Sequence, residues 1–353
     1  MRWLIGHPGP HFSVHDLYEG WTEALRGLGE DVYTFNLGDR ITFYDAAHID
    51  AGITDEQGRP GMRKALDRGT ALETAAHEIL RPAFLCWPDV VLLVSAFWYP
   101  PYLLDVMRGR GMKVVLLHTA SPYQDEEQLE RAGHADINLL NDPVNIMAYR
   151  DLGVPAAYMP HAYRPSVHYP APPGAAQKHD LAFVGTGFPS RIRFFEQMDL
   201  DGLDVHLAGM WMGLPPGSPL RDWTATTAPD CVDNFDTADI YRQARTGINL
   251  YRREGEDTWT GDAWAMGPRE AELAACGLYF ARDPRPESDQ LFPMLPSFTS
   301  PEEAGEQIRW ALAHPDQRQE AAAKARAAIA DRTFENNAKA LMRLIEKEVV
   351  AGA

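Results

Sequence analysis

Short apolar runs alternate with helical segments along most of the chain, and this alternation limits the possible folds more than any other feature. In the first half, such runs lie at residues 2–5, 90–94, 113–117, 137–140 and 156–159. Apolar runs without polar alternation are typical of strands that are buried on both faces. Because such strands need helices as covering layers, the pattern predicts a parallel sheet with helices on both sides.

A second series of the same kind follows a proline-rich stretch. Residues 160–178 hold five prolines and few aliphatic side chains, which is typical of an interdomain linker. Beyond it, apolar runs at 181–184, 205–208, 247–250 and 278–281 alternate with helical patterns at 189–198, 237–244 and 268–276. The residues from Pro301 onward have only helical patterns. We therefore expect an α/β protein with two Rossmann-like domains facing a cleft and a helical tail at the C-terminus.

Domain boundaries follow from these patterns. We assign residues 1–164 to a first domain, 165–178 to the linker, 179–332 to a second domain, and 333–353 to a helix that packs back on the first domain. Residues 35–80 fit the alternation poorly. We interpret them as a loop followed by a helix over 62–80.

Charge and cysteine content narrow the function classes. The 50 acidic and 33 basic residues give a net charge of -17, and such a surface repels a polyphosphate backbone, so nucleic acid is not an expected partner. The three cysteines are far apart and form no CxxC pair, which indicates neither a disulfide framework nor a zinc site. No signal-peptide pattern and no apolar run long enough for a membrane helix are present, so we expect a cytoplasmic protein without a membrane span.

Ligands of open parallel sheets bind beyond the carboxyl ends of the strands, where helix N-termini favour anions. Two glycine pairs follow predicted strands, Gly6 with Gly9 and Gly185 with Gly187. Neither pair completes a GxGxxG motif, and a glycine pair alone is often a plain turn. A standard dinucleotide site is therefore not expected.

The segment most informative about function is 267–277, Gly-Pro-Arg-Glu-Ala-Glu-Leu-Ala-Ala-Cys-Gly, which precedes a predicted strand. Here the sequence resembles the second domain of GT-B glycosyltransferases, in the group related to the spore maturation protein CgeB and the glycosyl transferases group 1 family. The family's arginine and glutamate fall on Arg269 and Glu272. Further similar segments are 183–187 with Arg191, 248–250 and 159–161, and the resemblance spans roughly residues 115–345.

The resemblance implies a donor site in the second domain. Glu272 would accept hydrogen bonds from the ribose hydroxyls of a nucleoside diphosphate sugar. Arg191, Arg252, Arg269 and the amides near Gly185 and Gly187 would hold the diphosphate, next to the strand that ends at Asn249. The alternative for Glu272 is a solvated glutamate at a helix start, and for each arginine a surface or salt-bridged position.

For the chemical step, the resemblance implies retention of the anomeric configuration without a metal, with the leaving phosphate taking the acceptor's proton. His118, at the end of a predicted strand, and His161, in the linker element, are candidates to contact the sugar, although a histidine in such a place is often structural. Many relatives have a first glutamate eight positions before the ribose glutamate, where this chain has Trp264. Asp262 is the carboxylate that would replace it.

We therefore expect a glycosyltransferase that moves a sugar from a nucleoside diphosphate sugar, as co-substrate, to an unidentified acceptor, and that needs no other cofactor. One alternative is a nucleotide-sugar epimerase on the same fold. Another is a non-catalytic nucleotide- or sugar-binding protein, which Trp264 in place of the glutamate would suit. A DNA acceptor is disfavoured by the charge.

Overall fold

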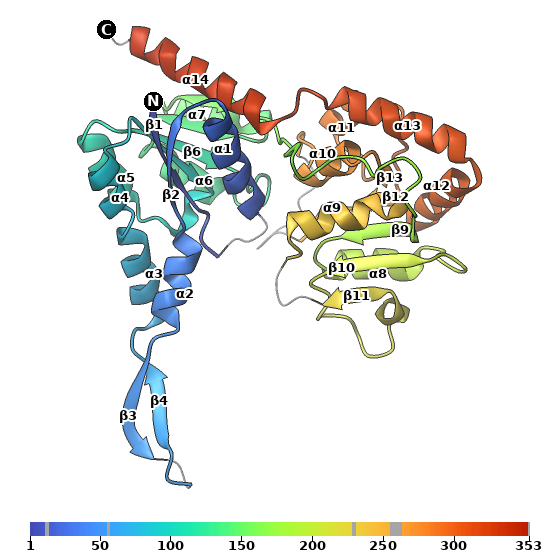
Figure 1. Ribbon diagram of the computed structural model, residues 1–353, viewed down its shortest axis with the longest axis horizontal. Helices are drawn as coiled ribbons and strands as arrows, with labels where there is room; N and C mark the ends of the chain where they lie inside the picture. The colour runs from blue at the N-terminus through green and yellow to red at the C-terminus, as the bar shows by residue number, and fades with distance from the viewer. Residues whose placement is uncertain (11–13, 55–56, 228–230, 255–262, 352–353) are drawn as a thin grey trace. The chain divides into compact units, whose positions relative to one another are not determined.

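The computed structural model describes residues 1–10, 14–54, 57–227, 231–254 and 263–351. The chain divides into two compact units, Met1–Tyr158 (unit 1) and Met159–Ala353 (unit 2). Each unit contains one parallel β-sheet flanked by helices (Figure 1). The expected α/β class is thus confirmed. The prediction that residues 333–353 pack on the first domain stays a prediction, as does the cleft.

The sheet of unit 1 is parallel throughout its described strands. Their order across the sheet is β2 (Asp31–Phe35), β1 (Arg2–Gly6), β5 (Val90–Val94), β6 (Lys113–His118), β7 (Ile137–Leu140) and β8 (Ala156–Tyr158). The helices of this unit are α1 (His15–Gly27), α2 (Leu37–Asp45), α3 (Arg68–His77), α4 (Leu80–Cys86), α5 (Pro101–Gly109), α6 (Asp125–Ala132) and α7 (Ile146–Asp151). Every residue of β5 is buried, as its unbroken apolar run predicts.

Successive strand residues point to opposite sides of this sheet, so both of its faces are apolar and both need a covering layer of helices. Leu93 and Leu116 belong to a buried cluster with Leu103 of α5. Helix α1 packs against β1 and β2 and buries Trp21 and Leu25. The apolar stripe of each helix therefore meets a sheet face, and the carboxyl ends of the strands are left as the edge where loops gather.

Residues 35–80 are where the sequence-based interpretation was wrong. Instead of a loop and one helix over 62–80, the chain forms α2, then an antiparallel hairpin of β3 (His48–Thr54) and β4 (Pro60–Lys64), then α3. The hairpin pairs only with itself among the described strands, and its side chains are mostly exposed, so no core-facing apolar pattern marks it. Helix α3 begins at Arg68 because the Asp67 carboxylate caps it by accepting from Thr70 N.

Unit 2 repeats the architecture with a second parallel sheet. Its described strands lie in the order β11 (Thr224–Thr227), β10 (Val205–Gly209), β9 (His179–Val184), β12 (Ala244–Asn249) and β13 (Tyr279–Arg282). The helices are α8 (Pro189–Gln197), α9 (Asn234–Arg242), α10 (Pro268–Ala275), α11 (Pro286–Leu291), α12 (Pro301–Ala313), α13 (Pro315–Ala328) and α14 (Phe334–Ala351). The predicted strands and helices of this half are confirmed within a few residues, and the edge strand β11 was missed.

Two apolar clusters cover the faces of this second sheet. Tyr241 of α9 and Leu273 of α10 lie in one cluster. Phe195 of α8 and Ile308 of α12 lie in the other, together with Phe183 of β9. Helices α9 and α10 thus line one face, and α8 and α12 line the other. Among the described helices of the chain, none combines the length and apolarity that crossing a bilayer demands.

Candidate functional site

Several segments of unit 2 meet at the carboxyl edge of its sheet. They are the loop that follows β9, the end of β12 and the first turns of α8, α9 and α10. Helix N-termini at such an edge present unpaired N–H groups and the positive ends of their dipoles. This edge is therefore the place in unit 2 where a phosphorylated ligand fits best.

Glycines let the loops at this edge approach one another closely. A Cβ on Gly185 would lie 3.0 Å from Nη2 of Arg269, and a Cβ on Gly209 would lie 2.3 Å from the Gly185 carbonyl oxygen. Gly209 also has a φ of +118°, which side chains rarely tolerate. On Gly187, a Cβ would meet the Trp211 ring at 2.5 Å. Close packing therefore accounts for glycine at all three positions. That the amides near Gly185 and Gly187 bind phosphate stays a prediction.

Glu272 lies on α10 and contacts the start of α9. Its Oε1 accepts a hydrogen bond from Nδ2 of Asn234 at 3.2 Å. The side chain is half-buried, and desolvation raises the pKa of this carboxyl, an effect opposed by the nearby Arg269 charge and by the Asn234 hydrogen bond. A half-buried carboxylate with one oxygen held leaves acceptor capacity for a ligand hydroxyl.

The Asn234 amide also adjoins His168, from the proline-rich stretch. Nε2 of His168 lies 3.5 Å from Nδ2 of Asn234, and Nδ1 accepts from the Arg164 backbone N–H at 3.3 Å. The Arg164 guanidinium lies 5.4 Å from the ring centroid of Phe235, the residue after Asn234. His168 could not be recognised from the sequence, since no local pattern links it to residues so far away in the chain.

Arg269 joins the Glu272 region to the end of β12. Its Nη1 donates to Oδ1 of Asn249 at 3.3 Å, and its guanidinium lies 5.4 Å from the ring centroid of Phe183. Asn249 is the last residue of β12 and is buried. The structure therefore brings Arg269, Asn249, Glu272 and Gly185 together, as the resemblance implies for a donor site.

Arg191 and Arg252 both lie against Phe188, at the start of α8. Their guanidinium carbons are 5.2 and 5.0 Å from the centre of that ring. Arg191 is buried, and it donates to the backbone oxygens of Thr186 at 3.0 Å and Leu250 at 2.7 Å. In this arrangement Arg191 connects the loop after β9 to the segment after β12. That Arg191 also contacts a diphosphate stays a prediction.

Glu254 already occupies the N-terminus of α8. Its carboxylate accepts from the backbone N–H of Ser190 at 2.7 Å and from the Ser190 hydroxyl at 2.9 Å. These hydrogen bonds outweigh partial burial and lower the pKa of Glu254. A carboxylate at this point shows that the helix start accepts an anion. Nothing in the sequence marks Glu254 as functional, because a lone glutamate in a loop has no distinguishing pattern around it.

Glu270 lies two residues before Glu272 but is fully buried. Its oxygens accept from the hydroxyls of Tyr251 and Ser288, the latter at 2.8 Å. Burial raises the pKa of Glu270 to about 7, although both hydrogen bonds and the Arg282 charge oppose the rise. Glu270 thus anchors α10 to its neighbours, and Glu272 is left as the acidic side chain of this helix nearer to solvent.

His118 lies in unit 1, at the end of β6. It is buried, its Nε2 is 2.9 Å from Oδ1 of Asn138, and its ring packs edge-on against Tyr149. Burial lowers the pKa of His118 to about 4, so the ring is neutral at pH 7. A neutral, buried histidine with a fixed partner is what a purely structural role would require. The contact of His118 with a sugar stays a prediction.

The remaining candidates are His161, Asp262 and the position of Trp264. His161 is buried, in a segment tied to α14 by a 2.8 Å hydrogen bond from Asn337 Nδ2 to the Pro160 carbonyl. Trp264 is half-buried, and its carbonyl accepts from the Glu287 N–H at 3.1 Å. Asp262 lies outside the described residues, so its predicted role has no structural counterpart.

Comparison with known families supports the resemblance in this part of the chain. Residues 191–343 match the model of a family described as glycosyl transferase-like. Most of unit 2 is thus similar to a glycosyl transferase-like domain. The matched range begins at Arg191 and includes Asn249, Arg269 and Glu272. No curated protein sequence matches the chain.

Solved structures resemble the chain over almost its whole length. Sucrose-phosphate synthase from Thermosynechococcus elongatus has 12% identity and a TM-score of 0.64, with 99% of each chain covered. HepE of Anabaena, in complex with UDP-glucose, has 12% identity and a TM-score of 0.60, covering 98% of this chain and 100% of its own. An α-glucosyltransferase in complex with UDP and a 13-mer DNA has 13% identity and a TM-score of 0.59, with 94% and 95% covered. The glycosyl transferase-like domain thus lies in a chain with the GT-B glycosyltransferase fold, as expected.

Proposed function

We propose that this chain is a glycosyltransferase that moves a sugar from a nucleoside diphosphate sugar to an acceptor, with retention of configuration and without a metal. The observation that carries the proposal is the grouping of Glu272, Arg269 and Asn249 at the carboxyl edge of the unit 2 sheet, inside the matched domain. The complexes of HepE with UDP-glucose and of the α-glucosyltransferase with UDP make uridine diphosphate sugars the first donors to test.

In this proposal, different side chains at the carboxyl edge of the sheet bind different parts of the donor. Glu272, which Asn234 orients, accepts hydrogen bonds from the ribose hydroxyls. Arg269, which Asn249 orients, faces the diphosphate and stabilises the charge that develops as it leaves. Amide groups of the Gly185–Gly187 loop and the start of α8 add donors to the phosphate oxygens. Because the leaving phosphate itself takes the acceptor's proton, the reaction needs no protein nucleophile.

The acceptor is unidentified, and a nucleic acid is disfavoured by the net charge of -17. We place the reaction in the cytoplasm, because Cys86 and Cys276 are buried free thiols, which suits a reducing compartment. Nothing in the chemistry of transfer requires a further cofactor, since the nucleotide sugar supplies both the sugar and the leaving group.

Thermal unfolding with a panel of nucleoside diphosphates and their sugars tests the proposal. A ligand at one hundred times its Kd stabilises the folded protein by about 2.7 kcal/mol. We expect one base to raise the Tm of the wild type and of the control Glu302→Ala, an exposed position on α12, and to raise the Tm of Glu272→Ala by clearly less. Equal stabilisation of Glu272→Ala would contradict the ribose assignment.

Product analysis then separates the three function classes. A transferase slowly releases free sugar from the stabilising donor when no acceptor is present. An epimerase converts the donor into a second nucleotide sugar, and a binding protein leaves the donor unchanged. Release of free sugar, lost in Glu272→Ala, is the expected result, and either of the other two outcomes would overturn the transferase proposal.

A further inference from the structure

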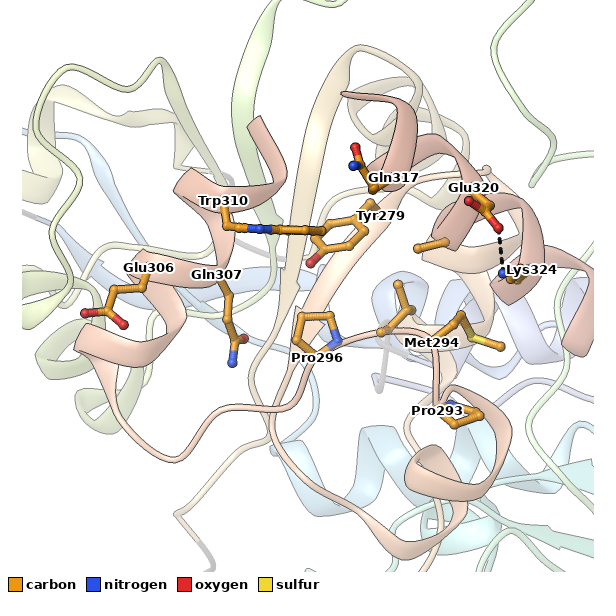
Figure 2. A pocket seen from close by; sticks show the side chains of 12 residues that line it. Tyr279, Pro293, Met294, Pro296, Glu306, Gln307, Trp310, Gln317, Glu320 and Lys324 are labelled. Atoms are coloured by element: carbon orange, nitrogen blue, oxygen red, sulfur yellow. Dashed lines mark ion pairs between the residues drawn. The ribbon is translucent and has the colours of Figure 1, made fainter. Parts of the chain in front are cut away.

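A pocket in unit 2 is lined by residues other than those of the proposed donor site. It is a pocket of about 670 Å³ between α12, α13 and the segment 293–296, with Tyr279 of β13 also in its wall (Figure 2). Tyr279 begins β13, whereas Asn249 of the donor edge pairs with Arg282, at the end of that strand. Pro296, in the pocket wall, accepts from the Arg282 N–H at 3.2 Å, so the pocket lies along the edge strand β13, and its lining includes none of Asn249, Arg269 and Glu272. Its volume is within the roughly 300–1,000 Å³ of small-molecule sites.

An aromatic side chain with a fixed orientation borders this pocket. Trp310 of α12 is 47% exposed although it is large and apolar. Its ring stacks on that of His314, with centroids 4.6 Å apart and an interplanar angle of 19°. Figure 2 shows the indole projecting from α12 into the space that Pro296 and Met294 also border. The stacked histidine holds the indole in place and leaves much of it open as a flat apolar surface.

Polar groups surround the apolar wall. Glu306 and Gln307 come from α12, and Gln317, Glu320 and Lys324 come from α13. Lys324 is paired with Glu320 at 2.7 Å, so the cation is neutralised and Glu306 leaves the lining net negative. An anionic ligand is therefore repelled. A purely apolar ligand would cover these charges without hydrogen-bonding them, which is costly.

We propose that this pocket binds a neutral saccharide. A pyranose has an apolar C–H face that fits against the Trp310 indole and an edge of hydroxyls that donate to the carboxylates and exchange hydrogen bonds with the amides of Gln307 and Gln317. It carries no charge for the acidic lining to repel. The site goes beyond the proposed donor site, because it would hold the glycan part of an acceptor and does not depend on the nucleotide.

Direct binding of oligosaccharides by the full chain tests the proposal. The probes are a microarray of neutral and acidic oligosaccharides, followed by titration calorimetry with the neutral hit. Three proteins are compared: the wild type, Trp310→Ala and Trp87→Ala. Trp87 is a matched control, because it is 39% exposed and stacked by Arg110, but lies in unit 1. A fourth variant, Gln317→Ala, removes one amide without touching the aromatic surface.

We expect at least one neutral oligosaccharide to bind the wild type and Trp87→Ala equally, with a tenfold or greater loss in Trp310→Ala and a smaller loss in Gln317→Ala. Stabilisation of Trp310→Ala by a nucleoside diphosphate should equal that of the wild type, which also shows that the variant is folded. The proposal is overturned if no neutral oligosaccharide binds, if only acidic ones bind, or if Trp310→Ala retains full affinity. These outcomes do not depend on how Glu272→Ala binds nucleotides. The donor-site proposal and the saccharide-pocket proposal can therefore fail independently of each other.

Discussion

Replacing Glu270 of α10 by glutamine tests whether burial raises the pKa of the Glu270 carboxyl. The Glu270 side chain is inaccessible to solvent and accepts hydrogen bonds from the Tyr251 and Ser288 hydroxyls. Glutamine has nearly the same shape, and its amide exchanges hydrogen bonds with both hydroxyls, which can donate or accept. The variant therefore keeps the packing and removes only the titration.

The magnitude follows from the shift in pKa. Burial raises the pKa of Glu270 from 4.5 to about 7, so the folded protein binds more protons than the unfolded chain between these values. Stability from this group is thus fully present below pH 4.5 and is lost as the pH rises through about 7. At 1.36 kcal/mol per pKa unit the whole shift is worth about 3 kcal/mol. Roughly 2–3 kcal/mol of it is lost between about pH 5 and pH 8.

Scanning calorimetry at pH 5 and pH 8 measures how the stability of Glu270→Gln differs from that of the wild type at each pH. Other groups titrate equally in the wild type and in Glu270→Gln, so they cancel. The free energy of unfolding of the variant, relative to wild type, should rise by about 2–3 kcal/mol from pH 5 to pH 8. For a domain of this size that corresponds to roughly 5–10 °C in Tm.

The control is Glu306→Gln, the same substitution at an exposed position on α12, which gives the baseline for removing a carboxylate that is not buried. The reasoning is refuted if the Tm difference between Glu270→Gln and wild type is the same at both pH values within about 1 °C. In that case Glu270 would be ionised throughout, and burial would not govern its pKa.

Three further predictions follow from individual contacts. Gly209→Ala places a Cβ 2.3 Å from the Gly185 carbonyl at a φ of +118°, so we expect a loss of roughly 2 kcal/mol or more in stability, and an unchanged Tm would contradict this. His118→Gln keeps a donor for Asn138. Since burial lowers the pKa of His118 to about 4, wild type should lose about 3 kcal/mol of stability relative to the variant from pH 8 to pH 4, and parallel pH profiles of the two proteins would refute this. Glu254→Gln removes a negative charge from the start of α8, so calorimetric titration should show tighter binding of a nucleoside diphosphate there, and unchanged or weaker binding would exclude the helix start as a phosphate site.

The layers of the fold were predictable because burial leaves a clear pattern in the sequence. The apolar run of β5, for example, is buried at every position. The hairpin of β3 and β4 has no such pattern, since its strands are largely exposed and face no core. Where a segment makes few core contacts, periodicity does not reveal it.

The site was predictable only in the residues that the family resemblance marks. Glu272 and Arg269 lie at positions the motif identifies, and the structure brings them together. Composition alone does not show that Glu270 is buried while Glu272 is half-exposed, because that depends on Tyr251 and Ser288, which other segments contribute. Asn234, His168 and Glu254 reach the site through tertiary contacts between distant parts of the chain.

Comparing a nucleoside diphosphate with its 2′,3′-dideoxy analogue tests the central assignment most directly. Calorimetric titration of wild type and Glu272→Ala with both compounds, using the base that stabilises best, measures what the carboxylate contributes through the ribose hydroxyls. Hydrogen bonds to a charged group are worth about 1.5–3 kcal/mol each, so wild type should bind the dideoxy compound at least about tenfold more weakly. Glu272→Ala should bind both compounds equally. Equal affinity of wild type for the two, or a preference retained by Glu272→Ala, would contradict the account.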